Sequence, residues 1–292
     1  PYFLSRPRRF GKSLLLSTFE AYFEGKKELF EGLTIAELEK EWKKYPVLHL
    51  DLNAEKYDSP QALVEILSRH LTQWEVKYGK GEDEETLSGR FAGVIRRASE
   101  QAGCGVVVLV DEYDKPLLQA LGNGSLLDDY RRTLKAFYGV LKSSDRYLRF
   151  VFLTGVTKFA QVSVFSDLNQ LNDISLDFAY ATLCGITKEE LGSTFVPELE
   201  RQAAVNDMTS EAVMEMMTRR YDGYHFHPKG AGVFNPFSVL NSFSKQEFGS
   251  YWFQTGTPTF LVELLKESDY DLRTLIDGIE ASASSFMEYR VD

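Results

Sequence analysis

The sequence predicts a three-layer α/β fold with a parallel sheet, followed by a mainly helical domain. An uninterrupted apolar run at 106–110 is typical of a strand buried on both faces of a parallel sheet. Predicted strands and helices alternate up to about residue 186, which is the pattern of parallel α/β proteins. Beyond that point helical segments dominate. We therefore expect an α/β domain over residues 1–186 and a helical domain over 187–292.

The individual elements are marked by local signals along the chain. Gly25 ends the first helix, and Ser59 with the following proline opens another. Thr187 and Glu190 have the spacing of a capping box at a helix start. The expected strands span 2–5, 47–52, 106–110, 148–155 and 182–186. The expected helices span 13–23, 59–78, 86–101, 128–141, 187–201, 209–220, 236–246 and 258–267.

A phosphate-binding loop is predicted where the first strand meets the first helix. Backbone N–H groups at a helix N-terminus bind phosphate oxygens. At this junction Lys12 is expected to reach the β- and γ-phosphates of ATP, and Ser13 to ligate Mg²⁺. The general phosphate-loop motif is Gly-x-x-x-x-Gly-Lys-Ser/Thr, and Arg6 occupies the position of its first glycine. Pro7 compensates for the missing glycine by fixing φ near the start of the loop. The residues expected to contact the nucleotide are Arg9, Phe10, Gly11, Lys12, Ser13 and Leu14.

Two adjacent carboxylates, Asp111 and Glu112, end the buried strand at 106–110. Ligands of open α/β sheets bind at the carboxyl ends of the strands. We expect Asp111 to hold the same Mg²⁺ as Ser13, and Glu112 to orient or deprotonate the attacking water. Thr154 ends the next strand, where P-loop ATPases with an additional strand carry a polar sensor. It is a candidate for contacting the γ-phosphate or the water, and a plain strand-end threonine is the alternative.

Several segments resemble the bacterial AAA-ATPase-like family of predicted P-loop ATPases, over nearly the whole chain. They are Tyr-Phe-Leu-Ser-Arg-Pro-Arg-Arg-Phe-Gly-Lys-Ser (2–13), Leu-Val-Asp-Glu-Tyr-Asp-Lys-Pro-Leu (109–117), Phe-Leu-Thr-Gly-Val-Thr-Lys-Phe (152–159), Tyr-Asp-Gly-Tyr-His-Phe (221–226), Asn-Pro-Phe-Ser (235–238) and Thr-Gly-Thr-Pro (255–258). In that family Arg-Pro-Arg-Arg-Phe replaces the glycine-led loop. The resemblance implies a P-loop NTPase core with ATP and Mg²⁺. By analogy with related ATPases, the helical domain is a winged-helix-like lid. Many members continue into a C-terminal nuclease-like domain, which this chain would lack and which would be a partner.

Composition and charge exclude several classes of protein. The chain is 43% hydrophobic and 26% charged, as globular proteins are and disordered ones are not. No apolar run approaches the roughly 18–20 residues of a membrane-spanning helix, and we expect no secretory signal. A net charge of −10 argues against direct nucleic-acid binding by this segment. Because the chain starts at Pro1, inside the first expected strand, we expect a fragment.

The cysteines and histidines carry little functional signal. Cys104 and Cys184 have neither metal nor disulfide spacing and are expected to be buried free thiols. A cytoplasmic location follows as the default. His225 and His227 could form half of a metal site, but no third ligand is evident.

Two further features leave alternatives open. An arginine often stabilises charge on the transferring phosphoryl group, and the candidates are Arg131, Arg146, Arg149 and Arg220. The helical domain also holds an aromatic cluster, which serves either packing or the stacking of one ring on adenine. Its members are Tyr221, Tyr224, His225, Phe226, Phe234, Phe237, Tyr251, Trp252 and Phe253.

The sequence therefore favours an ATPase that hydrolyses the β–γ phosphate bond of ATP with Mg²⁺. Three alternatives stay open. In the first, ATP sets the position of the helical lid and hydrolysis is negligible. In the second, the ATPase serves an adjacent nucleic-acid-processing domain. In the third, the chain is a scaffold that binds no nucleotide.

Overall fold

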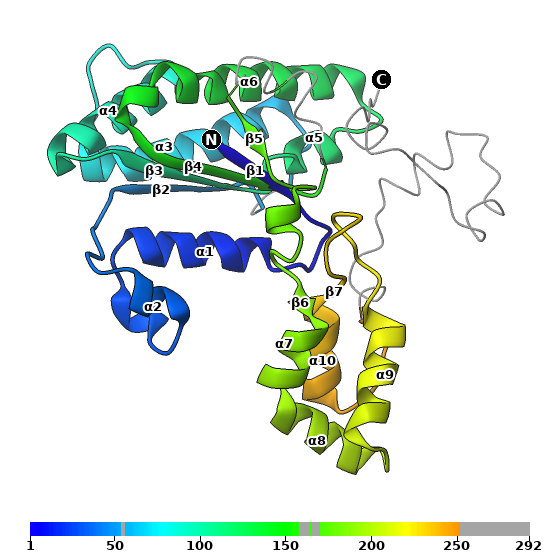
Figure 1. Ribbon diagram of the computed structural model, residues 1–292. Coiled ribbons are helices and arrows are strands. Elements are labelled where there is room, and N and C mark those ends of the chain that lie inside the picture. Colours follow the sequence, from blue (N-terminus) through cyan, green and yellow to red (C-terminus); the bar gives the residue numbers. More distant parts are fainter. Residues whose placement is uncertain (54–55, 158–163, 165–169, 252–292) are drawn as a thin grey trace. The chain divides into compact units, whose positions relative to one another are not determined.

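The computed structural model describes residues 1–53, 56–157, 164 and 170–251. This part of the chain divides into two compact units (Figure 1). The first, called here the sheet unit, comprises Pro1–Ser5 and Leu16–Asn172. The second, called the helical unit, comprises Arg6–Leu15 and residues 173–251. The division assigns the predicted phosphate loop to the helical unit, although the strand before it belongs to the sheet unit.

The sheet has five strands in the order β2-β3-β4-β1-β5. Their bounds are β1 Tyr2–Ser5, β2 Val47–Asp51, β3 Val106–Asp111, β4 Leu148–Gly155 and β5 Asn172–Asp173. The pairs β1/β4, β3/β4 and β2/β3 are parallel. Leu4 stands opposite Thr154, and Asp51 opposite Asp111. The predicted α/β fold is therefore confirmed, and β4 lies between the strand that leads into the loop and the strand that ends in the carboxylates.

Helices cover both faces of this sheet (Figure 1). Helix α1 (Lys12–Phe23) lies on one face, and α3 (Pro60–Tyr78), α4 (Leu87–Ala102) and α6 (Gly124–Ser143) lie on the other. The alternation of side chains along β4 explains the two contacts. Phe150 and Phe152 meet Phe19 of α1, with ring centroids 5.4 and 5.0 Å apart. Val151 and Leu153 point into the core of the opposite face.

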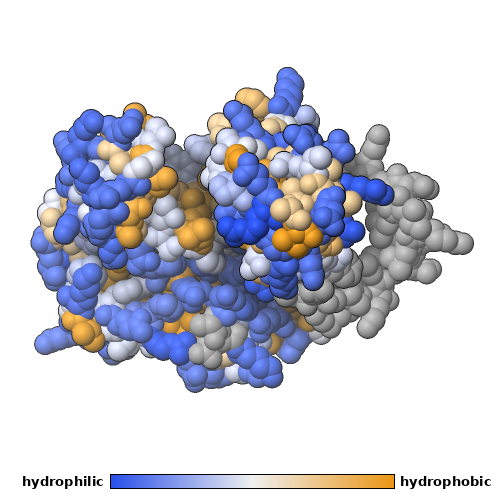
Figure 2. Space-filling view, turned by 90° about the horizontal axis from the view of Figure 1, so that it is seen from below, coloured by the Kyte–Doolittle hydropathy of each residue, from blue (hydrophilic) through white to orange (hydrophobic). Residues whose placement is uncertain are grey.

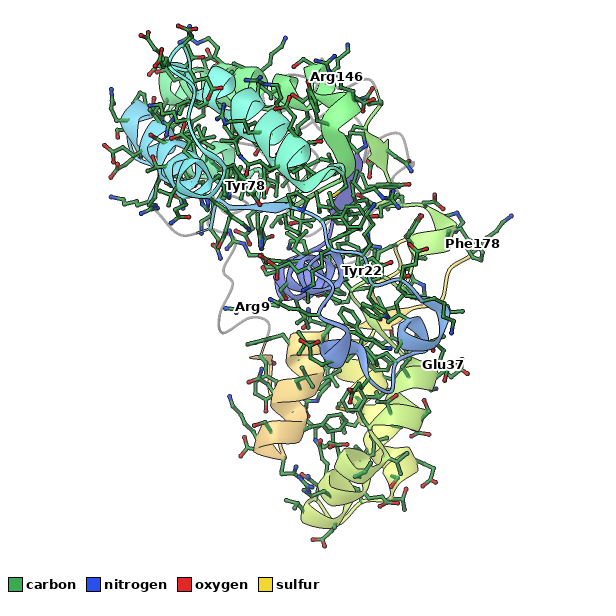
Figure 3. All side chains as sticks on the ribbon, turned by 90° about the vertical axis from the view of Figure 1, so that its left-hand side faces the viewer. Arg9, Tyr22, Glu37, Tyr78, Arg146 and Phe178 are labelled. Atoms are coloured by element: carbon green, nitrogen blue, oxygen red, sulfur yellow. The ribbon has the colours of Figure 1, made fainter. Side chains whose placement is uncertain are left out.

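Short elements complete the sheet unit. They are η1 (Lys27–Phe30), α2 (Thr34–Leu38), α5 (Lys115–Gln119) and η2 (Asp145–Tyr147). Tyr22 of α1, labelled in Figure 3, donates its hydroxyl to Glu39 Oε2 at 2.5 Å and packs edge-on against Trp42. The glutamate raises the pKa of Tyr22 to about 12. This contact ties the segment after α2 to α1.

The helical unit has a core of its own, formed by Leu191, Val213, Met217, Phe234 and neighbouring side chains. Its elements are β6 (Ile186–Thr187), α7 (Lys188–Thr194), α8 (Val196–Val205), α9 (Ser210–Tyr221), β7 (Val233–Phe234) and α10 (Pro236–Lys245), with the one-turn helix η4 (Phe178–Tyr180) before them. Strands β6 and β7 pair antiparallel. The predicted capping box of Thr187 and Glu190 is present at the start of α7.

The structure differs from the sequence prediction mainly at two places, and in addition α6 begins at Gly124, ahead of the expected residue 128. The fifth strand of the sheet is β5 and not 182–186, because Cys184 has a φ of 69° and interrupts an extended backbone. The helix expected at 187–201 is two helices, since α7 ends at Thr194 and α8 begins at Val196. Pro197 lies in the first turn of α8, where its missing N–H costs no hydrogen bond within the helix. The helix expected at 258–267 lies outside the described residues.

The face seen in Figure 2 is mostly hydrophilic, with hydrophobic residues scattered over it in small groups. Among the helices that the structure describes, none is long and apolar enough to cross a membrane. The large exposed hydrophobic side chains include Leu14, Leu29 and Leu38. Isolated residues of this kind are normal on folded proteins.

Candidate functional site

The predicted phosphate loop leaves β1 at Arg6 and enters α1 at Lys12. Its two left-handed residues are Arg9, with φ 67°, and Gly11, with φ 72°. Lys12 is 5% exposed, and its Nζ donates hydrogen bonds to the carbonyls of Arg6, at 3.0 Å, and Pro7, at 3.3 Å. Ser13 and Leu14 are exposed in the first turn of α1. Two carbonyls of the loop thus accept hydrogen bonds from the lysine of the same loop, while Ser13 is exposed.

Arg6 does not make the bend that a glycine makes in the general motif. Its φ is not positive, and its side chain is buried, with 1% exposed. Its guanidinium donates to the carbonyls of Ser175 at 2.7 Å, Tyr180 at 2.8 Å and Leu183 at 3.1 Å. Burial lowers the pKa of Arg6 to about 10, which still leaves the group charged at neutral pH. Arg6 therefore anchors the start of the loop to the 175–183 segment.

Aromatic rings of the helical unit pack against the loop. Phe10 is fully buried and meets Tyr224 and Phe226 edge-on, with centroids 4.7 and 5.5 Å apart. The Arg9 guanidinium, labelled in Figure 3, lies 4.7 Å from the centre of the Phe237 ring. These contacts join the loop to the 221–226 and 235–238 segments, and they give several members of the predicted aromatic cluster a packing role.

The acidic end of β3 meets the polar end of β4. Asp111 is the last residue of β3 and is 3% exposed. Thr154, fully buried on β4, donates its hydroxyl to Asp111 Oδ1 at 2.6 Å. Glu112 follows with φ 49°, a left-handed conformation that costs a non-glycine residue about 1–2 kcal/mol. The structure thus brings together three residues that the sequence singled out, and a contact of Thr154 with phosphate or water stays a prediction.

Asp114 was not singled out from the sequence, although it organises the turn after β4. It is fully buried, and its Oδ2 accepts hydrogen bonds from the backbone N–H of Val156 at 2.9 Å and of Thr157 at 2.7 Å. The Thr157 hydroxyl donates to the same oxygen at 2.6 Å. Tyr113 N–H donates to the Thr154 carbonyl at 3.0 Å. The sequence signal that could have pointed to Asp114 is a second acidic residue three positions after Asp111.

Gly155 is required where these two segments meet. A Cβ at this position would lie 2.5 Å from Cε1 of the Tyr113 ring, closer than real contacts allow. The Tyr113 hydroxyl also donates to the Thr157 carbonyl at 2.9 Å. The 111–114 and 154–157 segments are therefore held as one hydrogen-bonded block, which fixes the position of the Asp111 carboxylate.

Residues 1–165 match the protein family described as Predicted AAA-ATPase. The chain belongs to this family. A curated relative from Azotobacter chroococcum mcd 1, named "Uncharacterized protein in vnfD 5′ region", is 41% identical over 266 residues, which are 91% of this chain and 49% of the relative. The chain thus spans about half the length of that relative. The family description suggests nucleotide binding, and the name of the relative adds no activity or substrate.

The ligand chemistry of this predicted AAA-ATPase fits Mg²⁺ bound together with a nucleotide. In the described ranges, no group of three or more His, Cys, Asp or Glu side chains gathers as a metal site. Mg²⁺ at phosphate sites needs only one or two protein ligands, because phosphates and waters supply the rest. The Ser13 hydroxyl and the Asp111 carboxylate are oxygen ligands of the kind that Mg²⁺ prefers.

The four arginines that are candidates for stabilising the transferring phosphoryl group each contact a neighbouring residue in the predicted AAA-ATPase. Arg131 pairs with Asp128 at 3.3 Å, and Arg146 donates to the Tyr147 hydroxyl at 2.8 Å. Arg149 lies 5.9 Å from the centre of the Tyr45 ring, and Arg220 donates to the Phe248 carbonyl at 2.7 Å. These contacts do not single out one arginine for a role in phosphoryl transfer.

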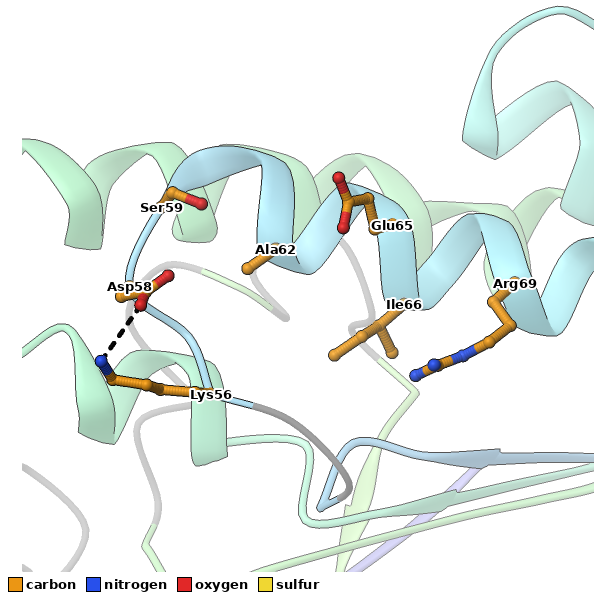
Figure 4. Close-up of a pocket in the computed structure, with 7 residues that line it drawn as sticks. All are labelled: Lys56, Asp58, Ser59, Ala62, Glu65, Ile66 and Arg69. Carbon is orange, nitrogen blue, oxygen red and sulfur yellow. Dashed lines mark ion pairs between the residues drawn. The ribbon is translucent and has the colours of Figure 1, made fainter.

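A polar pocket of about 370 Å³ lies at the start of α3 (Figure 4). Its lining includes Glu65, Ile66 and Arg69, and at its rim Lys56 Nζ lies 3.2 Å from Asp58 Oδ2. Both partners of this ion pair are well exposed, at 83% and 59% of the side chain. None of the residues predicted to contact the nucleotide lines this pocket.

Proposed function

We propose that this chain binds ATP with Mg²⁺ and hydrolyses the bond between the β- and γ-phosphates. The observation that supports this most is the place of β4 between β1 and β3. This strand order is the arrangement expected of P-loop ATPases with an additional strand. It also places Thr154 beside Asp111, so that the threonine hydroxyl donates a hydrogen bond to the carboxylate. Family membership supports nucleotide binding independently.

The proposed roles follow from the chemistry of each group. Lys12 leaves the two loop carbonyls that it now contacts and pairs with phosphate oxygens, while backbone N–H groups of Arg9–Leu14 donate to them. Ser13 and Asp111 hold Mg²⁺. Thr154 keeps Asp111 oriented through its hydroxyl.

Glu112 is proposed as the general base. It directly follows the metal-binding carboxylate, and its left-handed backbone is strained, with φ 49°. Such strain in a non-glycine residue clusters at functional sites, where the surrounding structure compensates its cost. A carboxylate beside the reacting phosphate can orient or deprotonate the attacking water.

The test is ATP binding and turnover with and without Mg²⁺ in the wild type, Lys12→Ala and Glu112→Gln. Loss of a charged hydrogen-bond donor is expected to weaken ATP binding about 10- to 150-fold in Lys12→Ala. Glu112→Gln should bind ATP normally and lose turnover by about 10²- to 10⁴-fold. The exposed residues Lys27 and Glu85 offer matched controls, Lys27→Ala and Glu85→Gln, which should behave as wild type.

The same measurements separate the alternative functions. Tight ATP binding without wild-type turnover would support a nucleotide-dependent switch. Turnover stimulated by added DNA would support a module that serves a nucleic-acid-processing domain. We keep residues 1–186 as the proposed ATPase core and 187–292 as the proposed lid, and limited proteolysis with and without ATP tests that boundary. Absence of any ATP or Mg²⁺ binding would overturn the proposed function.

A further inference from the structure

A small pocket of about 230 Å³ lies within the helical unit, at the C-terminal end of α9 and the N-terminal end of α10. It lies below the roughly 300–1,000 Å³ of sites that hold drug-sized ligands. Its volume therefore suits one ring system and not a whole nucleotide. The side chains that line it include Tyr221, Tyr224, Asn235, Ser238 and Tyr251.

One lining residue, Asn235, carries a buried hydrogen-bond donor that the described part of the chain leaves without an acceptor. Its side chain caps α10, since Oδ1 accepts from the backbone N–H of Ser238 at 2.9 Å. The residue is 1% exposed, and its Nδ2 has no hydrogen-bond partner among the residues that the structure describes. A buried polar group without a partner is rare and costs about 1–3 kcal/mol. It therefore points to an acceptor supplied by a ligand.

One residue that lines the pocket also contacts the phosphate loop. Tyr224 lines the pocket, and its ring packs 4.7 Å from the ring of Phe10, the residue before Gly11. Arg9 lies over Phe237, which stands between the two lining residues Asn235 and Ser238 in the sequence. Loop and pocket belong to the same compact unit. The loop and the pocket are therefore linked within one unit through the contact of Phe10 with Tyr224.

We infer that the pocket binds the purine base of the nucleotide, an inference that rests on the proposed ATP binding. The flat faces of the tyrosine rings suit a planar aromatic ligand. Oδ1 of Asn235 already accepts the hydrogen bond that caps α10, so its Nδ2 is the side-chain atom that can bond to the base. It donates to a ring nitrogen, and adenine presents N7 and N3 as acceptors. Asn235 thus contributes one directional contact, and the tyrosines contribute stacking.

The experiment compares calorimetric binding of Mg²⁺-ATP and of Mg²⁺-tripolyphosphate, which has the phosphates without the base. Asn235→Ser and Asn235→Asp both keep a side-chain oxygen that caps α10 and remove the amide donor. Each is expected to weaken ATP binding about three- to tenfold, the equivalent of one hydrogen bond. Tripolyphosphate binding should stay at the wild-type level. Thr209→Ser, a conservative change at the cap of α9, is the matched control and should change neither.

Every outcome decides between the two proposals. If both Asn235 variants bind ATP as the wild type does, the base pocket is overturned while the loop proposal stands. If both Asn235 variants lose affinity for ATP and for tripolyphosphate by the same factor, Asn235 acts through the loop, and the assignment of the pocket to the base is again wrong. If the wild type binds tripolyphosphate as tightly as ATP, the base contributes nothing and the pocket is not its site. A wild type that binds neither ligand overturns the proposed function itself.

Discussion

The guanidinium carbon of Arg6 lies 3.8 Å from the centre of the Phe226 ring. The same guanidinium donates to three backbone carbonyls that are 169 to 177 residues away along the chain. A planar guanidinium can stack its face on an aromatic ring while its N–H groups donate hydrogen bonds to several acceptors. The ammonium group of a lysine has no flat face to stack in this way. The arginine that replaces the first loop glycine therefore connects the loop to the rest of the helical unit.

Replacing Arg6 with alanine should destabilise the helical unit strongly. The change removes the donor of one buried and two partly buried hydrogen bonds to carbonyls, and we expect the free energy of unfolding to fall by about 3 kcal/mol or more. Arg6→Lys should recover only part of this, because an ammonium group lacks the forked geometry. Chemical denaturation measures the effect, with the exposed neighbour Arg8→Ala as the control at about 0.5 kcal/mol or less. Equal losses in the two alanine variants would contradict the anchoring role.

Removing the Thr154 hydroxyl should weaken the Asp111 site without changing its shape. In Thr154→Val, Asp111 Oδ1 loses a buried donor at 2.6 Å, and the free energy of unfolding should fall by about 1–3 kcal/mol. The Mg²⁺ concentration for half-maximal ATP binding should rise, because the carboxylate is no longer held. Thr154→Ser keeps the hydroxyl and should restore that concentration. A serine variant as impaired as the valine variant would show that packing, and not the hydrogen bond, matters here.

Adding a methyl group at Gly155 should disrupt the block formed by 111–114 and 154–157. The new Cβ would lie 2.5 Å from the Tyr113 ring, and overpacking of this kind costs about 1–3 kcal/mol. Gly139→Ala is the control, because this glycine lies inside α6 and an added methyl group would meet no side chain of the described residues within 4 Å. That change should stabilise by about 0.5–1 kcal/mol. Thermal unfolding measures both effects. Equal shifts of the melting temperature in the two variants would refute the steric argument.

Acid should weaken the contact between α3 and α4 through one ion pair. Arg90 Nε and Nη2 each lie 2.7 Å from a carboxylate oxygen of Glu75, and both side chains are about nine-tenths buried. Hydrogen bonds from Arg90 hold the pKa of Glu75 below its ordinary 4.5. The pair therefore contributes fully above pH 4.5, and its contribution is lost as the pH falls through the lowered pKa of the folded state.

The pH dependence of unfolding tests this pair directly. From about pH 5 to about pH 3, the free energy of unfolding should fall more steeply in the wild type than in Glu75→Gln, which has no carboxylate to titrate. Glu65→Gln, at an exposed position of the same helix, should retain the wild-type slope. A Glu75→Gln slope equal to the wild type would show that the pair does not carry the acid sensitivity.

The strands and helices of the sheet unit were largely predictable from local patterns. The apolar run before Asp111 and the Gly-Lys-Ser junction after β1 need only neighbouring residues to be recognised. The fifth strand was misplaced because 182–186 is apolar enough for a strand, whereas Cys184 adopts a left-handed turn beside the buried Arg6. The role of Asp114 was missed because its partners, Val156 and Thr157, are more than forty residues away.

The sequence by itself determined the fold class, the loop that is proposed to hold phosphate, and the carboxylates that end β3. Periodicity and short motifs carry this information because helices, strands and loop starts depend on residues close together in the chain. Only the tertiary structure decided that β4 separates β1 from β3, that Thr154 holds Asp111, and that Arg6 is an anchor. Those facts depend on strand order and on hydrogen-bond partners far apart in the sequence, and no local pattern encodes either.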